Sequence, residues 1–200
     1  MRRGGFGGIG LLENNAGQLN GAVISTTARL KLRRFLPSDL SPFAALNADP
    51  EVMRYLGGAA LTRAQSDAIL FGADRSFVES GYGKIAVERI EDGAFLGTCG
   101  LSVESWYPDD MEIGWRLARA YWGFGHAGEA AAAWMPYAFE VLKAPRVISI
   151  SDAPNLRSIA VMKKIGLRFD HEAKLSEGGE SFDAVIYSSS FADWQTRQAG

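Results

Sequence analysis

The segment ARAYWGFGHAGEAAAAW, residues 118–134, contains the pattern G-x-G-x-x-G at Gly123, Gly125 and Gly128, followed by a run of alanines. Alanine is the strongest helix former, so the segment predicts a glycine loop that leads directly into a helix. The first N–H groups of a helix lack intrahelical partners, and with the helix dipole they favour an anion. Because Ala127 and the small residues after it leave these groups accessible, the segment predicts a phosphate-binding loop.

A dinucleotide is one candidate for the phosphate-containing ligand, because dinucleotide-binding folds use the same glycine spacing and Asp152 lies where a ribose-binding acid is expected. In those folds, however, the glycines follow a strand directly and several β-α units come afterwards. Here ARAYW separates the loop from the preceding strand, and little chain follows Asp152. A ligand-free turn would explain the glycines but not the helix of small residues that follows them.

Composition narrows the class of protein. A length of 200 residues favours one domain, and a net charge of -2 without a basic stripe argues against a nucleic-acid partner. No apolar segment has the length of a membrane span and no signal cleavage site is present, so we expect a cytoplasmic protein without a membrane partner. The single cysteine, Cys99, is expected to be a buried thiol, and no metal site is expected. The sequence leaves open whether the protein forms a homodimer.

The predicted domain organisation is a flexible glycine-rich extension over residues 1–24 and one folded domain over residues 25–200, since glycine- and asparagine-rich sequence buries little apolar area. Alternation of apolar residues predicts strands at 28–35, 83–90, 94–103, 111–117, 146–151, 167–175 and 181–190. Helical patterns cover 37–56, capped by Ser38 and broken near Pro50; 63–80, capped by Thr62 and closed by Gly81; 125–142, kinked at Pro136; and 155–165, stopped by Gly166. This order predicts an α/β (α+β) fold in which about seven strands form a mixed sheet.

The loop YWGFGHAGEA resembles the W-G-x-G-x-A-x-E-A loop of the GNAT superfamily of acetyl-CoA-dependent N-acetyltransferases, in the RimJ/RimL branch of ribosomal-protein N-terminal acetyltransferases. The segment NLRSIAVMKKIGLRF at 155–169 is similar to that family's N-x-x-S-x-x-x-x-x-K-x-G-F block. TARLKLRRFLPSDL, DPEVMRYL and MEIGWRL resemble its first strand and helix, its next segment and its fourth strand. The resemblance covers residues 26–190.

The resemblance implies helices on both faces of a sheet that splays between its fourth and fifth strands. It also implies acetyl-CoA as co-substrate, a primary amine as acceptor, and coenzyme A pyrophosphate as the anion at the loop. The backbone there would hold the pyrophosphate at Gly123, Phe124, Gly125, His126, Ala127 and Gly128. The strand edge at Leu117 and Ala118 would bind the pantetheine arm on one side and the Asn155 amide on the other.

The sequence departs from the family pattern at several positions. Trp122 stands where the wider superfamily has Gln or Arg, Gly128 stands where Thr is frequent, and Leu167 follows Gly166 where Phe is more common. The change at Gly128 removes one hydroxyl donor to phosphate.

Acetyl transfer requires a neutral amine and a stabilised leaving thiolate. Glu112, on the strand before the loop, is the candidate base, and the alternative is an ordinary strand glutamate. Ser158 shares a helix face with Asn155 and is the candidate to protonate or hydrogen-bond the thiolate; alternatively, it only satisfies the helix backbone. We expect the backbone of His126 to contribute to the loop and its ring to face solvent without a catalytic role.

The segment ESWYPDD, residues 104–110, is a candidate acceptor wall through Trp106 and Tyr107, with Asp109 or Asp110 attracting a cationic amine. An ordinary exposed loop would have the same composition. The sequence does not separate a protein N-terminal amine from a small-molecule amine, and a catalytically silent acyl-CoA-binding or sensory module on the same fold stays as the second hypothesis.

Overall fold

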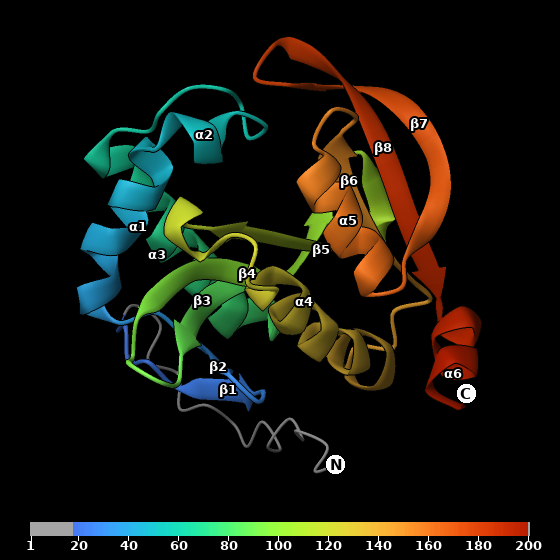
Figure 1. Cartoon of the computed structure of the whole chain (residues 1–200), viewed down its shortest axis with the longest axis horizontal. Helices are drawn as coiled ribbons and strands as arrows, with labels where there is room; N and C mark the ends of the chain where they lie inside the picture. The colour runs from blue at the N-terminus through green and yellow to red at the C-terminus, as the bar shows by residue number, and fades with distance from the viewer. Residues whose placement is uncertain (1–17, 200) are drawn as a thin grey trace.

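The computed structural model describes residues 18–199, and one eight-stranded mixed sheet runs through it in the order β1-β2-β3-β4-β5-β6-β8-β7 (Figure 1). Every neighbouring pair is antiparallel except β5 and β6, which are parallel and joined through a helix, as predicted. The strands are β1 (Val23–Thr26), β2 (Leu30–Arg33), β3 (Lys84–Arg89), β4 (Phe95–Glu104), β5 (Tyr107–Leu117), β6 (Arg146–Asp152), β7 (Arg168–Glu177) and β8 (Glu180–Ser190).

Helices cover both faces of this sheet, as expected. Along β3, Ile85 and Val87 pack in the core beneath α4, whereas Ala86 between them packs in a second core with residues of α1 and α3. Because neighbouring strand residues point to opposite faces, these helices lie on opposite sides. The helices are α1 (Leu40–Ala48), α2 (Pro50–Met53), α3 (Arg63–Ser80), α4 (His126–Pro136), α5 (Leu156–Lys164) and α6 (Phe191–Ala199).

The sheet splays between β5 and β6, which are the fourth and fifth strands of the predicted order. They pair only at Met111 with Val147 and at Glu112 with Ile148, and then diverge toward their C-terminal ends. In Figure 1, α1, α2 and α3 lie on one side of this divergence, and α5 lies with β6, β7 and β8 on the other. The glycine loop follows β5 and the N-terminus of α5 follows β6, so both segments lie at the open end of the splay.

Several sequence-based boundaries are confirmed. Thr62 caps α3 by accepting from the N–H of Gln65, whose side chain accepts from the N–H of Thr62 in return, and Gly81 ends the helix with φ 77°.

Cys99 is fully buried, as expected, and burial raises the pKa of its thiol to about 12. No helix in the described part of the chain is both long and apolar enough to cross a membrane.

The sequence missed two elements, the strand β1 and the helix α6, so the sheet has eight strands where about seven were predicted. Of the predicted flexible extension, residues 1–17 lie outside the described residues. Residues 18–24 belong to the fold: Gly21 donates to the carbonyl of Phe35, Arg34 donates to that of Ala22, and Ile24 is buried in β1. The predicted boundary at residue 24 therefore falls inside β1.

Three local expectations were wrong. Ser38 caps no helix, because the N–H of Leu36 is satisfied by the carboxylate of Asp39 and Ser38 lies inside a 3-10 turn. The helix predicted over 125–142 does change at Pro136, where the kink was expected, but it continues as a π-helical turn, Tyr137–Val141, and not as an α-helix. The expected loop 104–110 is largely strand: β5 begins at Tyr107, which pairs with Glu104, so the ladder continues although proline and aspartate are typical of turns.

Candidate active site

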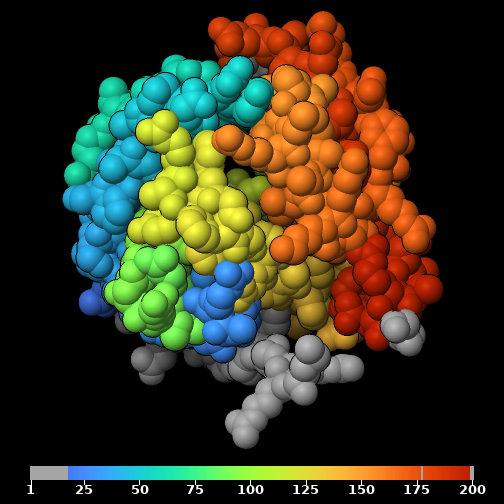
Figure 2. All heavy atoms as spheres, viewed as in Figure 1, coloured from blue at the N-terminus to red at the C-terminus, as the bar shows by residue number. Residues whose placement is uncertain are grey.

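A cleft of about 1400 Å³ opens where β5 and β6 diverge. The hollow is visible in Figure 2 between the yellow segment near residue 120 and the orange segment near residue 155. Its walls come from the C-terminal half of β5, the end of β6, the glycine loop, the first turn of α5, and α2 with the residues after it. A crevice beyond the carboxyl ends of parallel strands is a common ligand site in α/β folds.

The glycine loop forms one end of the cleft and has the geometry of an anion site. Gly123 and Gly125 have φ 84° and 81°, in the left-handed region that disfavours side chains, and α4 begins immediately after Gly125. A Cβ at Gly123 would have no atom within 4 Å, so the backbone is open to a ligand there. The N–H groups that begin α4 lie beside that opening, and the loop therefore fits a phosphate group.

An ionic contact from the β1–β2 turn braces this loop. Arg29 Nη1 donates to the carbonyl of Phe124 at 3.0 Å, and its Nη2 lies 2.6 Å from Glu129 Oε2 in the first turn of α4. Thr27 Oγ1 also donates to Glu129 Oε1 at 2.5 Å. Burial by itself would raise the pKa of Glu129, but these hydrogen bonds outweigh it and lower the pKa. Sequence reasoning missed this brace, because it joins residues about a hundred positions apart.

The His126 ring was expected to face solvent, but the structure buries it. The residue is 4% exposed, its ring stacks on Phe124 at 5.9 Å, and Nδ1 is buried without a hydrogen-bond partner. Burial and then the nearby Arg29 lower the pKa of His126, whereas the backbone of Tyr121 acts in the opposite direction and favours the protonated ring. The net lowering of the pKa favours a neutral ring that packs under the loop.

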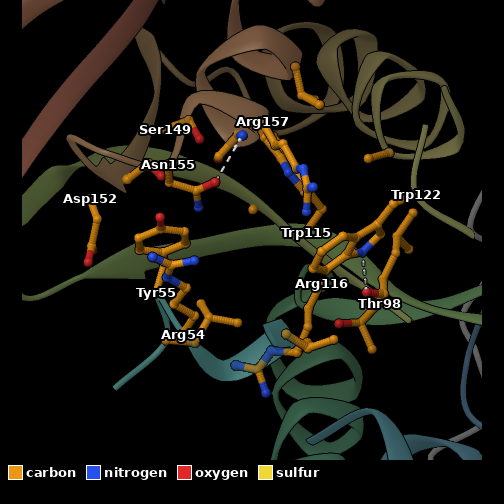
Figure 3. Close-up of a pocket in the computed structure, with 18 of the residues that line it drawn as sticks. Arg54, Tyr55, Thr98, Trp115, Arg116, Trp122, Ser149, Asp152, Asn155 and Arg157 are labelled. Atoms are coloured by element: carbon orange, nitrogen blue, oxygen red, sulfur yellow. Dashed lines mark hydrogen bonds between the residues drawn. The ribbon is translucent and has the colours of Figure 1, made fainter. Parts of the chain in front are cut away.

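The first turn of α5 forms the opposite wall of the cleft. Asn155 is the helix N-cap, and its Oδ1 accepts from the N–H of Ser158 at 3.2 Å (Figure 3). This capping bond uses only the amide oxygen of Asn155. Both Asn155 and Ser158 line the cleft, as the shared helix face predicted.

Glu112 lies in the cleft beside the splay and is 8% exposed. It is not a solvated strand glutamate: its Oε2 accepts from Lys84 Nζ at 2.6 Å and from Ser102 Oγ at 3.0 Å. A Cβ at Gly114 would lie 2.6 Å from Lys84 Nζ and 3.0 Å from both Glu112 oxygens, so this glycine makes room for the ion pair. Lys84 escaped sequence reasoning, because only the β3–β4–β5 register brings it to Glu112.

The two residues proposed at the strand edge differ in their surroundings. Leu117 lines the cleft, but its carbonyl accepts from the indole Nε1 of Trp122 at 2.7 Å (Figure 3). Ala118 does not line the cleft; its N–H donates to Leu96 and its carbonyl accepts from Tyr121. Trp122 therefore acts through its side chain as well, and the guanidinium of Arg157 covers its ring at 4.8 Å.

The remaining candidate site residues also divide into those that line the cleft and those that do not. Gly123, Gly125, His126, Ala127, Gly128 and Trp106 line the cleft, whereas Phe124, Tyr107, Asp109 and Asp110 do not. Phe124 is 64% exposed, so only its backbone belongs to the loop. The Tyr107 hydroxyl forms a hydrogen bond with His171 Nε2. Asp110 forms an ion pair with Arg146 at 2.5 Å, so its charge is already balanced and it is not expected to attract a cationic amine.

Residues that the sequence did not single out also line the cleft, and Figure 3 shows Arg54 and Tyr55 facing Asp152 and Asn155 across it. The Arg54 guanidinium lies 5.3 Å from the ring centroid of Tyr55. Both belong to the segment DPEVMRYL, which the sequence marked as similar to a family segment without assigning either residue to the site. Among residues 18–199, no group of three or more His, Cys, Asp or Glu side chains has an arrangement that could hold a metal ion.

Comparison with known proteins identifies relatives of this site and fold. Residues 29–168 match the model of the acetyltransferase (GNAT) domain family. YkkB, an uncharacterised Bacillus subtilis protein, is 33% identical in an alignment of 156 positions that covers 76% of this chain and 88% of YkkB. YnaD, an uncharacterised N-acetyltransferase of the same organism, is 29% identical over 84% of this chain and 98% of its own. A crystal structure of a GNAT-family acetyltransferase from Bacillus anthracis superposes with TM-score 0.69 at 27% identity, covering 84% of this chain and 98% of its own.

Proposed function

Because the chain belongs to the GNAT family of acetyltransferases, we propose that it transfers the acetyl group of acetyl-CoA directly to a primary amine. The observation that carries this proposal is the splay of β5 from β6, with the glycine loop at one end of the cleft and the first turn of α5 on its opposite wall. The loop supplies backbone donors for the phosphates, and the cleft supplies a path for an extended pantetheine arm.

In this proposal the backbone from Gly123 to Gly128 binds the diphosphate. The side-chain amide of Asn155, whose oxygen caps α5, presents its N–H groups to the pantetheine arm. The edge of β5 near Leu117 contacts the other side of the arm. Leu117 is preferred to Ala118 for that contact, because Ala118 does not line the cleft and both of its backbone groups already have partners.

Glu112 is the proposed base. The acceptor ammonium gives one proton to Glu112, the neutral nitrogen attacks the thioester carbonyl carbon and the carbon–sulfur bond breaks. The second proton of the nitrogen passes to the leaving thiolate, so the products are an amide and free coenzyme A. The two hydrogen bonds that Glu112 accepts are both at Oε2, which leaves Oε1 for the proton of the amine, directly or through water. Ser158 is proposed to donate a hydrogen bond to sulfur as negative charge develops there.

The acceptor is either a protein N-terminal amine or a small-molecule amine. The likeness of the loop and the N-x-x-S block to the RimJ/RimL branch supports a protein N-terminus. Trp106, which lines the cleft and stacks edge-on with Phe182, is the proposed apolar wall for the residue that bears the amine. Tyr107 contributes by packing beneath this wall rather than by contact.

The alternative is a silent acyl-CoA-binding module that keeps the loop and lacks the chemistry. One observation favours this alternative. Lys84 forms an ion pair with Glu112 and therefore competes with an acceptor ammonium for the same carboxylate. Retention of a buried carboxylate and a serine in one cleft favours the enzyme.

An acceptor screen with acetyl-CoA separates the two functions. Free thiol release is followed with peptides that begin with Ala, Ser or Met, with polyamines and with amino acids as acceptors. Turnover with any acceptor supports the transferase and excludes the silent module. Tight coenzyme A binding without turnover across the whole set would favour the silent module, and NAD binding at the loop would contradict both.

A further inference from the structure

The side chain of Lys164, in the last turn of α5, lies across the first turn of α4. A Cβ at Gly128 would lie 3.3 Å from Lys164 Cδ, and a Cβ at Gly125 would lie 3.3 Å from Lys164 Nζ. The aliphatic stem therefore passes over Gly128 and carries the ammonium to Gly125, the residue that precedes α4. Lys164 lines the cleft at this end.

The ammonium of Lys164 is an uncompensated positive charge next to Gly125, whereas Arg157, which also lines the cleft, has its guanidinium over the Trp122 ring at 4.8 Å. Arg29 is the other cation nearby, with Nη2 3.7 Å from a Cβ at Gly125, but Glu129 balances its charge at 2.6 Å. Within residues 18–199, Lys164 forms no ion pair with a carboxylate. A cation that adjoins a set of free backbone N–H groups strengthens the attraction for a phosphate.

We propose that Lys164 binds a phosphate group of coenzyme A at the glycine loop, and that Gly128 is the residue that lets it do so. This inference rests on the proposed function. A branched side chain at position 128 would place its Cβ against the Lys164 stem at 3.3 Å and push the ammonium away from Gly125. The family frequently has Thr at the position of Gly128. Glycine here removes the threonine hydroxyl as a phosphate donor and makes room for the Lys164 ammonium from α5.

The contact also ties α5 to the ligand at both of its ends. Asn155 caps the helix, Ser158 lies in its first turn, and Lys164 lies in its last. A coenzyme A molecule that contacts all three would hold α5 against α4. Loss of Lys164 is therefore expected to weaken binding of the phosphates while leaving the contacts of the pantetheine arm in place.

The test measures dissociation constants by calorimetry for the wild type, Lys164→Met and Lys163→Met, with coenzyme A, dephospho-coenzyme A and pantetheine as ligands. Lys163 is the matched control, because it is the adjacent lysine and its ammonium lies 6.0 Å from the ring of Tyr187 instead. Lys164→Met should weaken coenzyme A binding about five- to tenfold at low salt, the range for a partly exposed charge-assisted contact, and less at high salt. Lys163→Met should bind as the wild type does, and no variant should change pantetheine binding.

Dephospho-coenzyme A identifies which phosphate Lys164 contacts. A loss that persists with this ligand assigns the contact to the diphosphate, and a loss that disappears assigns it to the 3′-phosphate. A double-mutant cycle with Gly128→Val tests the role of Gly128, since Lys164→Met should have little further effect when the lysine is already displaced.

Unchanged coenzyme A affinity in Lys164→Met, or an equal loss with pantetheine, would overturn the role of Lys164 while leaving the proposed function intact. Full additivity in the cycle would overturn the role of Gly128. If the wild type itself binds no coenzyme A, the proposed function fails first and this inference fails with it.

Discussion

Gly125 is the residue at which backbone conformation and ligand charge act together. Its φ of 81° is one that residues with side chains rarely adopt, and it is the N-cap of α4, where the free N–H groups begin. Lys164 and Arg29 flank the position where a side chain would emerge. A carboxylate there would occupy the place of the phosphate and pair with those cations.

Replacing Gly125 with Asp should therefore weaken coenzyme A binding about a hundredfold, since loss of charge-assisted contacts costs about 3 kcal/mol. Gly93→Asp is the matched control: Gly93 has φ 71°, has no atom within 4 Å of a built Cβ and does not line the cleft, so it carries the same backbone strain without the phosphate. Calorimetry on both variants decides the point. Wild-type affinity in a folded Gly125→Asp protein would remove the loop as the phosphate site.

Glu112 offers a test of the chemical step. Glu112→Gln should lower single-turnover rates about a hundredfold with little change in acetyl-CoA affinity, because general acid–base groups typically contribute about that much. Ser158→Ala should also lower the rate of the chemical step. Lys84→Gln is the control, since it breaks the same 2.6 Å ion pair from the other side and keeps the carboxylate. Comparable rate losses in Lys84→Gln and Glu112→Gln would mean that the pair has a structural role.

His126 should make the stability of the protein depend on pH. Burial and the charge of Arg29 hold its pKa below the ordinary value of 6.5, so the unfolded chain binds a proton more readily than the folded chain. The wild type should therefore lose stability as the pH falls below about 6.5, because protons then favour the unfolded state. Denaturant unfolding should show a shallower loss for His126→Gln in this range. Above about pH 8 the two proteins should have equal slopes, because the wild-type ring is then neutral in both the folded and the unfolded state. Parallel curves at every pH would contradict the neutral buried ring.

At the scale of elements, helix starts are determined by which side chain meets the free N–H groups. Thr62 and Gln65 form a reciprocal cap at the start of α3, whereas Ser38 donates to and accepts from no such group at the start of the α1 region. Asp39 takes that place, since its carboxylate accepts from Leu36 and from both terminal nitrogens of Arg33.

Thr62→Ala should consequently cost about 1 kcal/mol of unfolding free energy, the usual value for a lost N-cap, while Ser38→Ala should stay within about 0.5 kcal/mol of the wild type. Chemical denaturation of the two variants measures the difference. Equal losses would show that the hydroxyl of Ser38 has a stabilising role which its contacts do not reveal.

At the scale of the whole molecule, the fold begins earlier than composition indicates. Residues 18–24 add hydrogen bonds to Phe35 and Arg34, and Ile24 joins the main core. Leu19 packs against the second core, beside α1 and α3. The segment therefore connects both faces of the sheet at the β1 edge.

Deletion of residues 1–24 should thus be more harmful than deletion of residues 1–17. The additional loss should be about 4 kcal/mol, from one buried isoleucine and two hydrogen bonds, or roughly 10 °C in Tm. Scanning calorimetry of the two truncated proteins measures it. Identical Tm values would show that β1 contributes nothing to stability and would restore residue 24 as the boundary.

The sequence by itself determined the features that depend on neighbours along the chain. The glycine spacing before a run of alanines predicted the loop and α4, Thr62 as a cap predicted the start of α3, and the helix between two strands predicted the parallel β5–β6 pair. Asn155 and Ser158 were predicted to share a surface because residues three apart on a helix always do. Such features arise from local backbone geometry, which a few consecutive residues control.

Only the tertiary structure decided which of these residues have partners. It brought Lys84 to Glu112 through strand register, turned the ring of His126 inward against Phe124, and laid Lys164 over Gly128. It also added β1, whose four residues carry too short a pattern to stand out and are stable only when paired with β2. These outcomes depend on contacts between residues far apart in the chain, and neither spacing nor composition encodes such distances.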